Sequence, residues 1–285
     1  KIGHMNIVNI YENYNSYFDQ EFKEIFEICS KAAEKNNYKI FLIGGLVRDM
    51  LLNRKSLDID ITVEGDAIEF GHVLERDCGA KILSVHKDFG TIKIEILGQN
   101  VDFASTRSER YPKAGHLPCV EEIGCPLEID VVRRDFTINS LAMSLNQATF
   151  ADLIDYVGGF EDLKAKKIKI LHDKSFIDDP TRIIRALKYS TRLAFEIEEH
   201  TFKLQEEYLK NINYDICYKR VKQEIQKTFE DCKQETFDRF IEQGIYKLIT
   251  PKDVLSPEIN IENLIKKYKS KHCWLVYFGV IAIDE

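Results

Sequence analysis

The sequence predicts an α+β fold, with a mixed sheet in an N-terminal domain and an all-helical region after it. Apolar strand-like runs and amphipathic segments follow one another to about residue 155, without regular βαβ repeats. Beyond Gly158-Gly159, Leu, Ile, Phe and Tyr recur at helical spacing, interrupted only by the short run KIKIL. A chain of 285 residues is long enough for two such domains.

The N-terminal elements are predicted from their periodicity. Apolar residues at three- and four-residue steps over 17–36 indicate a helix. The run KIFLI before Gly44-Gly45 predicts a strand, LVRDMLL a helix and LDIDITV a second strand. Residues 66–79 are predicted to form a helix, and KILSVH, GTIKIEIL and NVDFAST three strands joined by short turns. This succession predicts a mixed sheet rather than a parallel one.

Composition narrows the class of protein. The net charge of −7 argues against broad, nonspecific binding of nucleic acid through a basic surface. Without an apolar run of transmembrane length or a signal-peptide pattern, the chain is predicted to be cytoplasmic and not to enter a membrane. Seven cysteines without a C-x-x-C pair are typical of a cytosolic protein and argue against structural zinc. Gly3-His4-Met5 resembles an expression scar, so we expect the natural chain to start at Met5.

The first candidate site lies where the first predicted strand ends. Gly44 and Gly45 let the backbone approach a phosphate closely, and the start of the following helix offers free N–H groups. Arg48, one turn into that helix, can add a bidentate phosphate contact. Paired glycines are more often simply a tight turn, and the Lys-Ser/Thr of a P-loop is absent. Taken alone, this motif leaves both interpretations open.

Two carboxylates follow on the next predicted strand. Asp58 and Asp60 are two residues apart, so their side chains project from one face. Two carboxylates beside a phosphate-binding turn can hold Mg²⁺ on a nucleoside triphosphate. The alternative is a solvated strand face, but the glycine turn upstream favours a metal site. Asp102, in NVDFAST, is a candidate third carboxylate on an adjacent strand, for which a plain surface role is equally favoured.

The segment VVRRDFTINS offers groups suited to the rest of a nucleotide. Arg133 or Arg134 can neutralise a triphosphate, and Asp135 and Asn139 can hydrogen-bond ribose hydroxyls. Otherwise these residues are a helix cap and its surface neighbours. The pattern alone favours capping.

The segment DDPTRIIRA predicts a helix start that can also recognise a base. Asp179 is expected to be the N-cap, with Pro180 in the first turn. Arg182 follows three residues later on the same helical face. A carboxylate accepts from an exocyclic amino group, and a guanidinium donates to a ring nitrogen or carbonyl oxygen. Such a pair can select cytosine and adenine over guanine and uracil.

These motifs in this order resemble the class II tRNA nucleotidyltransferase (CCA-adding enzyme) and bacterial poly(A) polymerase family, within the DNA polymerase beta-like superfamily. The matching strings are GGLVRD, DID, RRDFTINS, GGFEDL and DDPTRIIRA, and they span roughly residues 38–230. YKRVKQEI resembles a further, weaker motif, in which Arg220 and Glu224 are predicted to pair along one helix. Asp178 stands where many family members have Glu.

The resemblance implies domains and residue roles. The expected domains are a polymerase-beta-like head over 5–156, a base-reading helical neck over 157–230, and a helical body over 231–285 that is shorter than usual for the family, as in a truncated chain or a short member. Asp58 and Asp60 are implied to hold two Mg²⁺ ions, with Asp102 as a further catalytic acid. The implied nucleotide-binding residues are Gly44, Gly45, Arg48, Asp49, Arg133, Arg134, Asp135, Asn139, Asp178, Asp179, Arg182 and Arg185.

The implied reaction is attack of a tRNA 3′-hydroxyl on the α-phosphate of ATP or CTP, with release of pyrophosphate and addition of CCA, CC or A. The segment 103–122 resembles the branch that contains split CC-adding and A-adding enzymes. Poly(A) polymerase is the alternative, disfavoured because no basic C-terminal extension is visible. A second alternative is an inactive nucleotide- or RNA-binding module, disfavoured because both acids and the ribose motif are intact. No feature of the sequence indicates an oligomeric state.

Overall fold

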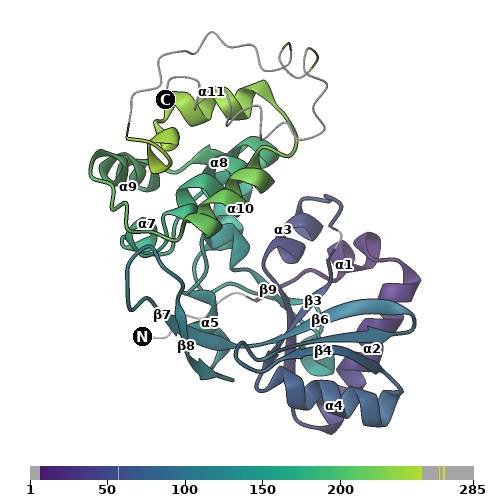
Figure 1. Ribbon diagram of the computed structural model, residues 1–285. Helices are drawn as coiled ribbons and strands as arrows, with labels where there is room; N and C mark the ends of the chain where they lie inside the picture. The colour runs from purple at the N-terminus through teal and green to yellow at the C-terminus, as the bar shows by residue number, and fades with distance from the viewer. Residues whose placement is uncertain (1–6, 57, 252–262, 264–265, 267–285) are drawn as a thin grey trace, which may run out of the picture. The chain divides into compact units, whose positions relative to one another are not determined.

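The computed structural model describes residues 7–56, 58–251, 263 and 266. These residues divide into two compact units (Figure 1). The first unit comprises the chain up to Arg110 together with Cys119–Lys164, and the second comprises Tyr111–Pro118 together with the chain from Ala165 onward. Most of the body predicted over 231–285 lies outside the described residues.

The first unit contains ten strands, six α-helices and two short 3₁₀ helices within its described residues. In chain order they are β1 (Val8–Asn9), α1 (Tyr11–Tyr17), α2 (Gln20–Lys35), β2 (Lys39–Ile43), α3 (Gly45–Leu51), β3 (Asp60–Glu64), α4 (Ala67–Cys78), β4 (Lys81–His86), β5 (Thr91–Ile96), β6 (Gln99–Ser105), β7 (Arg107–Arg110), β8 (Cys119–Ile123), α5 (Leu127–Val131), η1 (Thr137–Asn139), β9 (Ala142–Ser144), η2 (Gln147–Thr149), β10 (Asp152–Ile154) and α6 (Gly159–Lys164).

Eight of these strands form one mixed sheet in the order β1-β10-β9-β2-β3-β6-β5-β4. β3 and β6 run parallel, whereas the other neighbouring pairs in this sheet are antiparallel. β7 and β8 form a separate antiparallel hairpin. The predicted α+β class with a mixed sheet is confirmed. The helix predicted over 17–36 begins later, at Gln20, because the Asp19 carboxylate caps it by accepting from the N–H of Phe22 at 3.1 Å.

The two faces of the sheet differ in character. Along β5, Ile92, Ile94 and Ile96 are buried and alternate with Lys93 and Glu95. The apolar side packs against α4, which lies along one face in Figure 1. The approach is close, since a β-carbon at Gly71 of α4 would lie 2.6 Å from Cδ1 of Ile92. We call the opposite side, which carries Asp60, Lys93 and Asp102, the acidic face.

The second unit is mainly helical in the part of the chain that the structure describes. Its elements are β11 (Lys167–Ile168), α7 (Ser175–Asp178), α8 (Thr181–Leu193), β12 (Glu196–Ile197), α9 (Glu199–Lys210), α10 (Tyr218–Thr228), α11 (Gln234–Glu242) and η3 (Ile245–Leu248). β12 was not predicted, and it pairs in parallel with β11, which lies in the run KIKIL that interrupts the helical spacing.

Helix α8 lies at the centre of this unit, with α10 and α11 packed against it. Its residues Ile183, Ile184 and Leu187 are fully buried. The rings of Phe229 and Phe240, which connect α10 to α11, meet edge-on with centroids 5.1 Å apart. An apolar stripe that faces two neighbouring helices explains why helical spacing dominates this part of the sequence.

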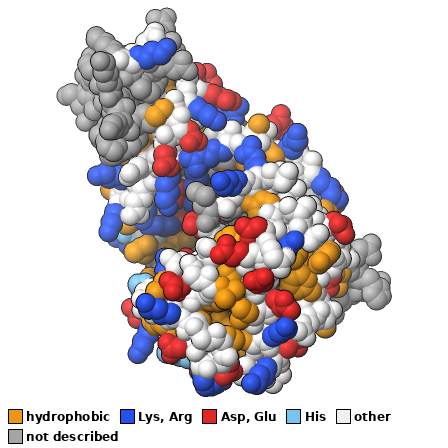
Figure 2. Space-filling view, turned by 90° about the vertical axis from the view of Figure 1, so that its right-hand side faces the viewer, with side chains coloured by type: hydrophobic (Ala, Val, Ile, Leu, Met, Phe, Trp, Pro, Cys, Tyr) orange, Lys and Arg blue, Asp and Glu red, His pale blue; other side chains and the backbone are white. Residues whose placement is uncertain are grey.

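The surface shown in Figure 2 has basic and acidic side chains lying among one another, as expected for a chain with a net charge of −7. Across residues 7–56 and 58–251, no helix has the length and apolar character that crossing a membrane requires.

Candidate active site

The glycine turn contacts one of the arginines predicted to bind a triphosphate. Gly44 joins β2 to α3 with φ +80°, a conformation that favours glycine. Its N–H donates to the carbonyl of Leu141 at 3.0 Å, which fastens the turn to the segment before β9. A β-carbon at Gly44 would lie 3.4 Å from Nη1 of Arg134. The first and third sequence motifs are therefore adjacent in the folded unit.

Arg48, Asp49, Asp135 and Asn139 form one hydrogen-bonded network. Nη1 of the buried Arg48 donates to Oδ1 of Asn139 at 2.6 Å, and its Nε donates to Oδ1 of Asp49 at 3.0 Å. Nδ2 of Asn139 in turn donates to Oδ1 of Asp135 at 3.1 Å. Burial raises the pKa of Asp49, and the charge of Arg48 opposes that rise. Four residues predicted from two distant motifs thus lie together, and their roles in nucleotide binding stay predictions.

Asp58, Asp60 and Asp102 converge on the acidic face. Asp60 and Asp102 are register partners across the parallel pair β3–β6. Asp58 precedes β3, and it alternates with the buried Ile59 in the way the sequence predicted. Burial, followed by the charges of Asp102 and Asp58, raises the pKa of Asp60. The charges of Asp58 and Asp102 therefore both act on Asp60.

This convergence suits a divalent cation. Carboxylate oxygens are hard donors, and Mg²⁺ in nucleotide enzymes is commonly held by one or two carboxylates together with substrate phosphates. Among the described residues, however, no three side chains of His, Cys, Asp or Glu are already arranged as a metal site. The acids present fit an ion that shares its coordination with a nucleotide.

Arg133 and Arg134 share a buried counter-charge that sequence reasoning missed. Asp130 is 0% exposed, and its two carboxylate oxygens lie 3.1 Å from Nη2 of Arg133 and 3.0 Å from Nη2 of Arg134. It also accepts from the backbone N–H of Arg107 at 2.9 Å. Burial alone would raise the pKa of Asp130, but the two guanidinium groups outweigh burial and lower it. Asp130 therefore orients both arginines.

A second missed carboxylate supports this arrangement. Glu109 on β7, with a side chain only 7% exposed, lies 2.8 Å from Nε of Arg107 and 3.4 Å from Nη1 of Arg133. The sequence held one usable signal, since Asp130 precedes the two arginines at the i+3 and i+4 spacing of a helix. Glu109 gave none, because it reaches Arg133 only through the fold.

In the second unit, the predicted base-reading residues are buried and held by neighbours. Asp179, 4% exposed, accepts from the hydroxyl and the N–H of Thr181 and lies 2.6 Å from Nη2 of Arg220. Nη1 of Arg182 donates to the Ser175 hydroxyl at 2.9 Å. The expectation that Asp179 is the N-cap of this helix is wrong by one residue, because α8 begins at Thr181 and Pro180 is its N-cap residue. Both predicted side chains are thus fixed in orientation.

The predicted pairing of Arg220 with Glu224 is wrong. Arg220 does not pair with Glu224: Arg220 contacts Asp179, while Glu224 lies 3.1 Å from Arg185 and 3.3 Å from Lys188. Both α10 side chains reach across to the α8 region, because helix packing makes a buried partner available there.

Two further links concern the loop between β7 and β8. The carbonyl of Asp178 accepts from the N–H of Gly115 at 3.0 Å. The guanidinium of Arg182 lies over the ring of Tyr111, 5.8 Å from its centroid. Tyr111–Pro118 thereby belongs with α8 in the second unit.

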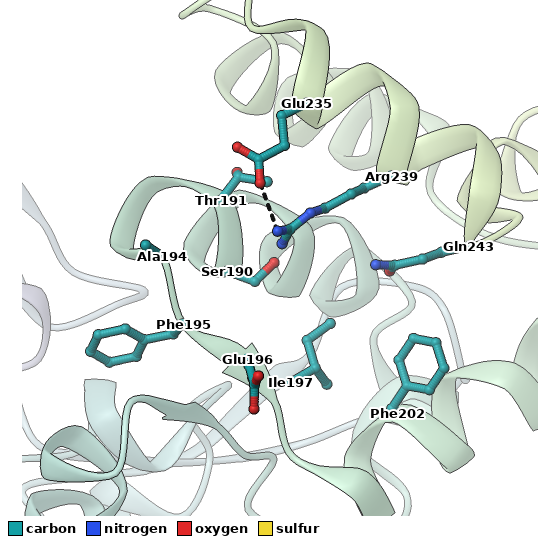
Figure 3. Close-up of a pocket in the computed structure, with 10 residues that line it drawn as sticks. All are labelled: Ser190, Thr191, Ala194, Phe195, Glu196, Ile197, Phe202, Glu235, Arg239 and Gln243. Carbon is teal, nitrogen blue, oxygen red and sulfur yellow. Dashed lines mark hydrogen bonds and ion pairs between the residues drawn. The ribbon is translucent and has the colours of Figure 1, made fainter. Parts of the chain in front are cut away.

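A separate pocket of about 430 Å³ lies in the second unit, and none of the predicted site residues line it. Figure 3 shows the Arg239 guanidinium paired with Glu235 at 2.6 Å on one side of this pocket. Phe195, Ile197 and Phe202 form its apolar side. The predicted chemistry does not depend on this pocket.

Comparisons with known proteins agree with the arrangement of these motifs. A family model described as the poly(A) polymerase head domain matches residues 40–169. The A-adding tRNA nucleotidyltransferase of Geobacter sulfurreducens is 37% identical over 254 residues, covering 87% of this chain and 28% of that protein. The enzyme of the same name from Aquifex aeolicus is 45% identical over 168 residues, covering 58% of this chain and 20% of that protein. The chain thus spans less than a third of the length of these two relatives.

Structural similarity to one solved protein extends over nearly the whole chain. The apo form II of a CCA-adding enzyme superposes with a TM-score of 0.85 at 30% sequence identity, covering 97% of this chain and 68% of that one. The glycine turn, the acidic pair, the arginine pair and the Asp179–Arg182 helix therefore occur within a fold that the two proteins share. The chain belongs to the tRNA nucleotidyltransferase and poly(A) polymerase family.

Proposed function

We propose that this chain transfers AMP, CMP or both from ATP and CTP to the 3′ end of tRNA, releasing pyrophosphate. The observation that carries the proposal is the pair Asp58 and Asp60 on the acidic face, close to Arg134 at the Gly44 turn. Phosphoryl transfer needs carboxylates that hold a metal ion and a positively charged side chain that binds phosphate, both within one site. An enzyme with this substrate is expected to work in the cytoplasm.

Nucleotidyltransferases of this family generally use divalent metal ions. We assign two Mg²⁺ ions to Asp58 and Asp60, with Asp102 as an accessory acid. When bound, such ions lower the pKa of the attacking hydroxyl and stabilise charge on the leaving oxygens.

The other head residues position the nucleotide. Arg134, held by Asp130, is proposed to offset the triphosphate charge, with Arg133 beside it. The Arg48–Asn139–Asp135 network is proposed to hold the ribose. These side chains are already oriented by their own hydrogen bonds, so little entropy is lost when the nucleotide binds.

Base selection is assigned to Asp179 and Arg182. The Asp179 carboxylate accepts from an amino group, and the Arg182 guanidinium donates to a ring nitrogen or carbonyl oxygen, a pattern that cytosine and adenine satisfy. Arg220 and Ser175 orient the two groups, while Asp178 and Arg185 flank them. No nucleic-acid template is required for this choice.

The names of the two relatives favour addition of a single A. Both curated proteins described above are named A-adding. Addition of a single A to a tRNA that already ends in CC is therefore the expected outcome, within the broader proposal of CCA, CC or A addition.

Primer extension tests the proposal. Transcripts ending at the discriminator base, at C or at CC are incubated with Mg²⁺ and each NTP. Extension by one A only after CC identifies an A-adding enzyme, and stepwise C, C, A addition identifies a CCA-adding one. Unlimited A addition would point instead to a poly(A) polymerase, and nucleotide binding without incorporation to the inactive module.

The Asp58→Ala variant tests the metal assignment. Because Asp58 is exposed, its loss should leave the thermal unfolding midpoint unchanged while abolishing incorporation. Asp77→Ala, a matched acid on α4 away from the acidic face, should keep full activity. Incorporation retained in Asp58→Ala would refute the assignment.

A further inference from the structure

Four register partners form a row across the acidic face. Asp60 on β3 pairs with Asp102 on β6, Asp102 pairs with Lys93 on β5, and Lys93 pairs with Ser84 on β4. Register partners on neighbouring strands present their side chains to the same face of a sheet. Lys93 is therefore the positively charged member of this row. Asp102 lies between Lys93 and Asp60.

Lys93 contacts the third acid directly. Its Nζ lies 3.6 Å from Oδ1 of Asp102, with the two side chains 45% and 49% exposed. An ammonium at this distance attracts the carboxylate and lessens the negative charge that Asp102 offers to another cation. Because the pair is half exposed and the lysine stem is flexible, the attraction is modest and reversible.

We propose that Lys93 is a positioning residue that competes with a divalent cation for Asp102. This inference rests on the proposed function, since it concerns the same acidic face. Its consequence is an acidic face that binds divalent ions weakly on its own, with Asp58 and Asp60 as the principal ligands. The nucleotide's phosphates then supply the missing negative charge, so the ions are taken up with the nucleotide rather than before it.

The test is a titration with Mn²⁺ in the absence of nucleotide, followed by electron paramagnetic resonance of the free ion. Lys93→Met should tighten Mn²⁺ binding by about 1.5- to fivefold, the range expected for removal of one exposed pair. Lys93→Arg, which keeps the charge, should bind like the unmodified chain. Lys81→Met is the matched control, because Lys81 on β4 is the register partner of Glu95 rather than of Asp102.

A double variant isolates the pairwise effect. In an Asp102→Asn background, Lys93→Met should tighten Mn²⁺ binding much less, because only the longer-range charge of Lys93 on Asp60 is then removed. An equal tightening there, or in Lys81→Met, would indicate a general charge effect and overturn the inference. Unchanged affinity in Lys93→Met, with Mn²⁺ binding that Asp58→Ala removes, would overturn the Lys93 role alone. Mn²⁺ binding that Asp58→Ala does not affect would overturn the proposed metal site together with this inference.

Discussion

Replacing Asp130 by Asn removes the one charge that two arginines share. The carboxylate is 0% exposed, whereas the side chains of Arg133 and Arg134 are 19% and 21% exposed. Loss of one partner from a buried ion pair typically costs about 3–5 kcal/mol. Because Arg133 keeps Glu109 at 3.4 Å, we expect the low end, about 3 kcal/mol, and a melting temperature lower by roughly 6–12 °C.

Urea unfolding of Asp130→Asn and of an exposed-pair control measures this cost. Glu27 and Lys31 lie 2.9 Å apart with side chains 62% and 65% exposed, so Glu27→Gln should change the free energy of unfolding by under about 0.5 kcal/mol. If Asp130→Asn costs no more than this control, the shared counter-charge does not hold the arginines.

The pH dependence gives an independent check on Asp130. Its pKa is lowered in the folded state, so its contribution is present above the unfolded value of about 3.9 and is lost as the pH falls through the folded value. The stability gap between the unmodified chain and Asp130→Asn should therefore narrow below about pH 4. A gap that stays constant down to pH 2 would contradict the lowered pKa.

Three further predictions concern other parts of the chain. Arg182→Ala should reduce the preference for ATP and CTP over GTP and UTP by about tenfold in kcat/KM, and unchanged selectivity would remove its base-reading role. Burial lowers the pKa of Lys188 to about 8, so its stabilising contribution is full above the unfolded value of about 10.4 and is lost as the pH falls towards 8. Unfolding free energy should thus rise more steeply from pH 8 to 10 in the unmodified chain than in Lys188→Met, and equal slopes would count against burial as the cause. Gly159→Ala should cost about 3 kcal/mol, because its β-carbon would lie 2.1 Å from a backbone carbonyl oxygen. Gly158→Ala, with φ +79° and open space around it, should cost only about 1 kcal/mol; the reverse order in thermal unfolding would refute this packing argument.

Sequence reasoning succeeds where chemistry follows local periodicity. The alternation around Asp58 and Asp60 placed both acids on the side of the chain opposite Ile59 at the start of β3, and the mixed sheet followed from the order of apolar runs. Strand alternation and helical spacing are local properties, so they can be recognised before the fold is known.

Sequence reasoning fails where the hydrogen-bond or ion-pair partner of a side chain comes from a distant element. Arg220 and Glu224 have ideal spacing for a pair within one helix, yet each bonds to residues of the α8 region. Lys93 looks like an ordinary strand residue until register places it beside Asp102, and Glu109 does so until the packing of β7 against α5 brings it to Arg133. Register is a long-range property, and a shift of one residue would turn each side chain to the other face.

The single parallel pair in the large sheet bears on how the chain folds. β3 and β6 can meet only after the intervening α4, β4 and β5 have formed a crossover, whereas β4–β5 and β5–β6 are local hairpins. Closing the longer loop costs more chain entropy, so Asp60 and Asp102 are expected to come together late in folding. Pulsed hydrogen exchange should therefore show amides of β5 protected before the Asp102 N–H, which donates to the Ile59 carbonyl just before β3. A chain that has not finished folding would then have no assembled acidic face, and so could not perform the proposed nucleotide transfer.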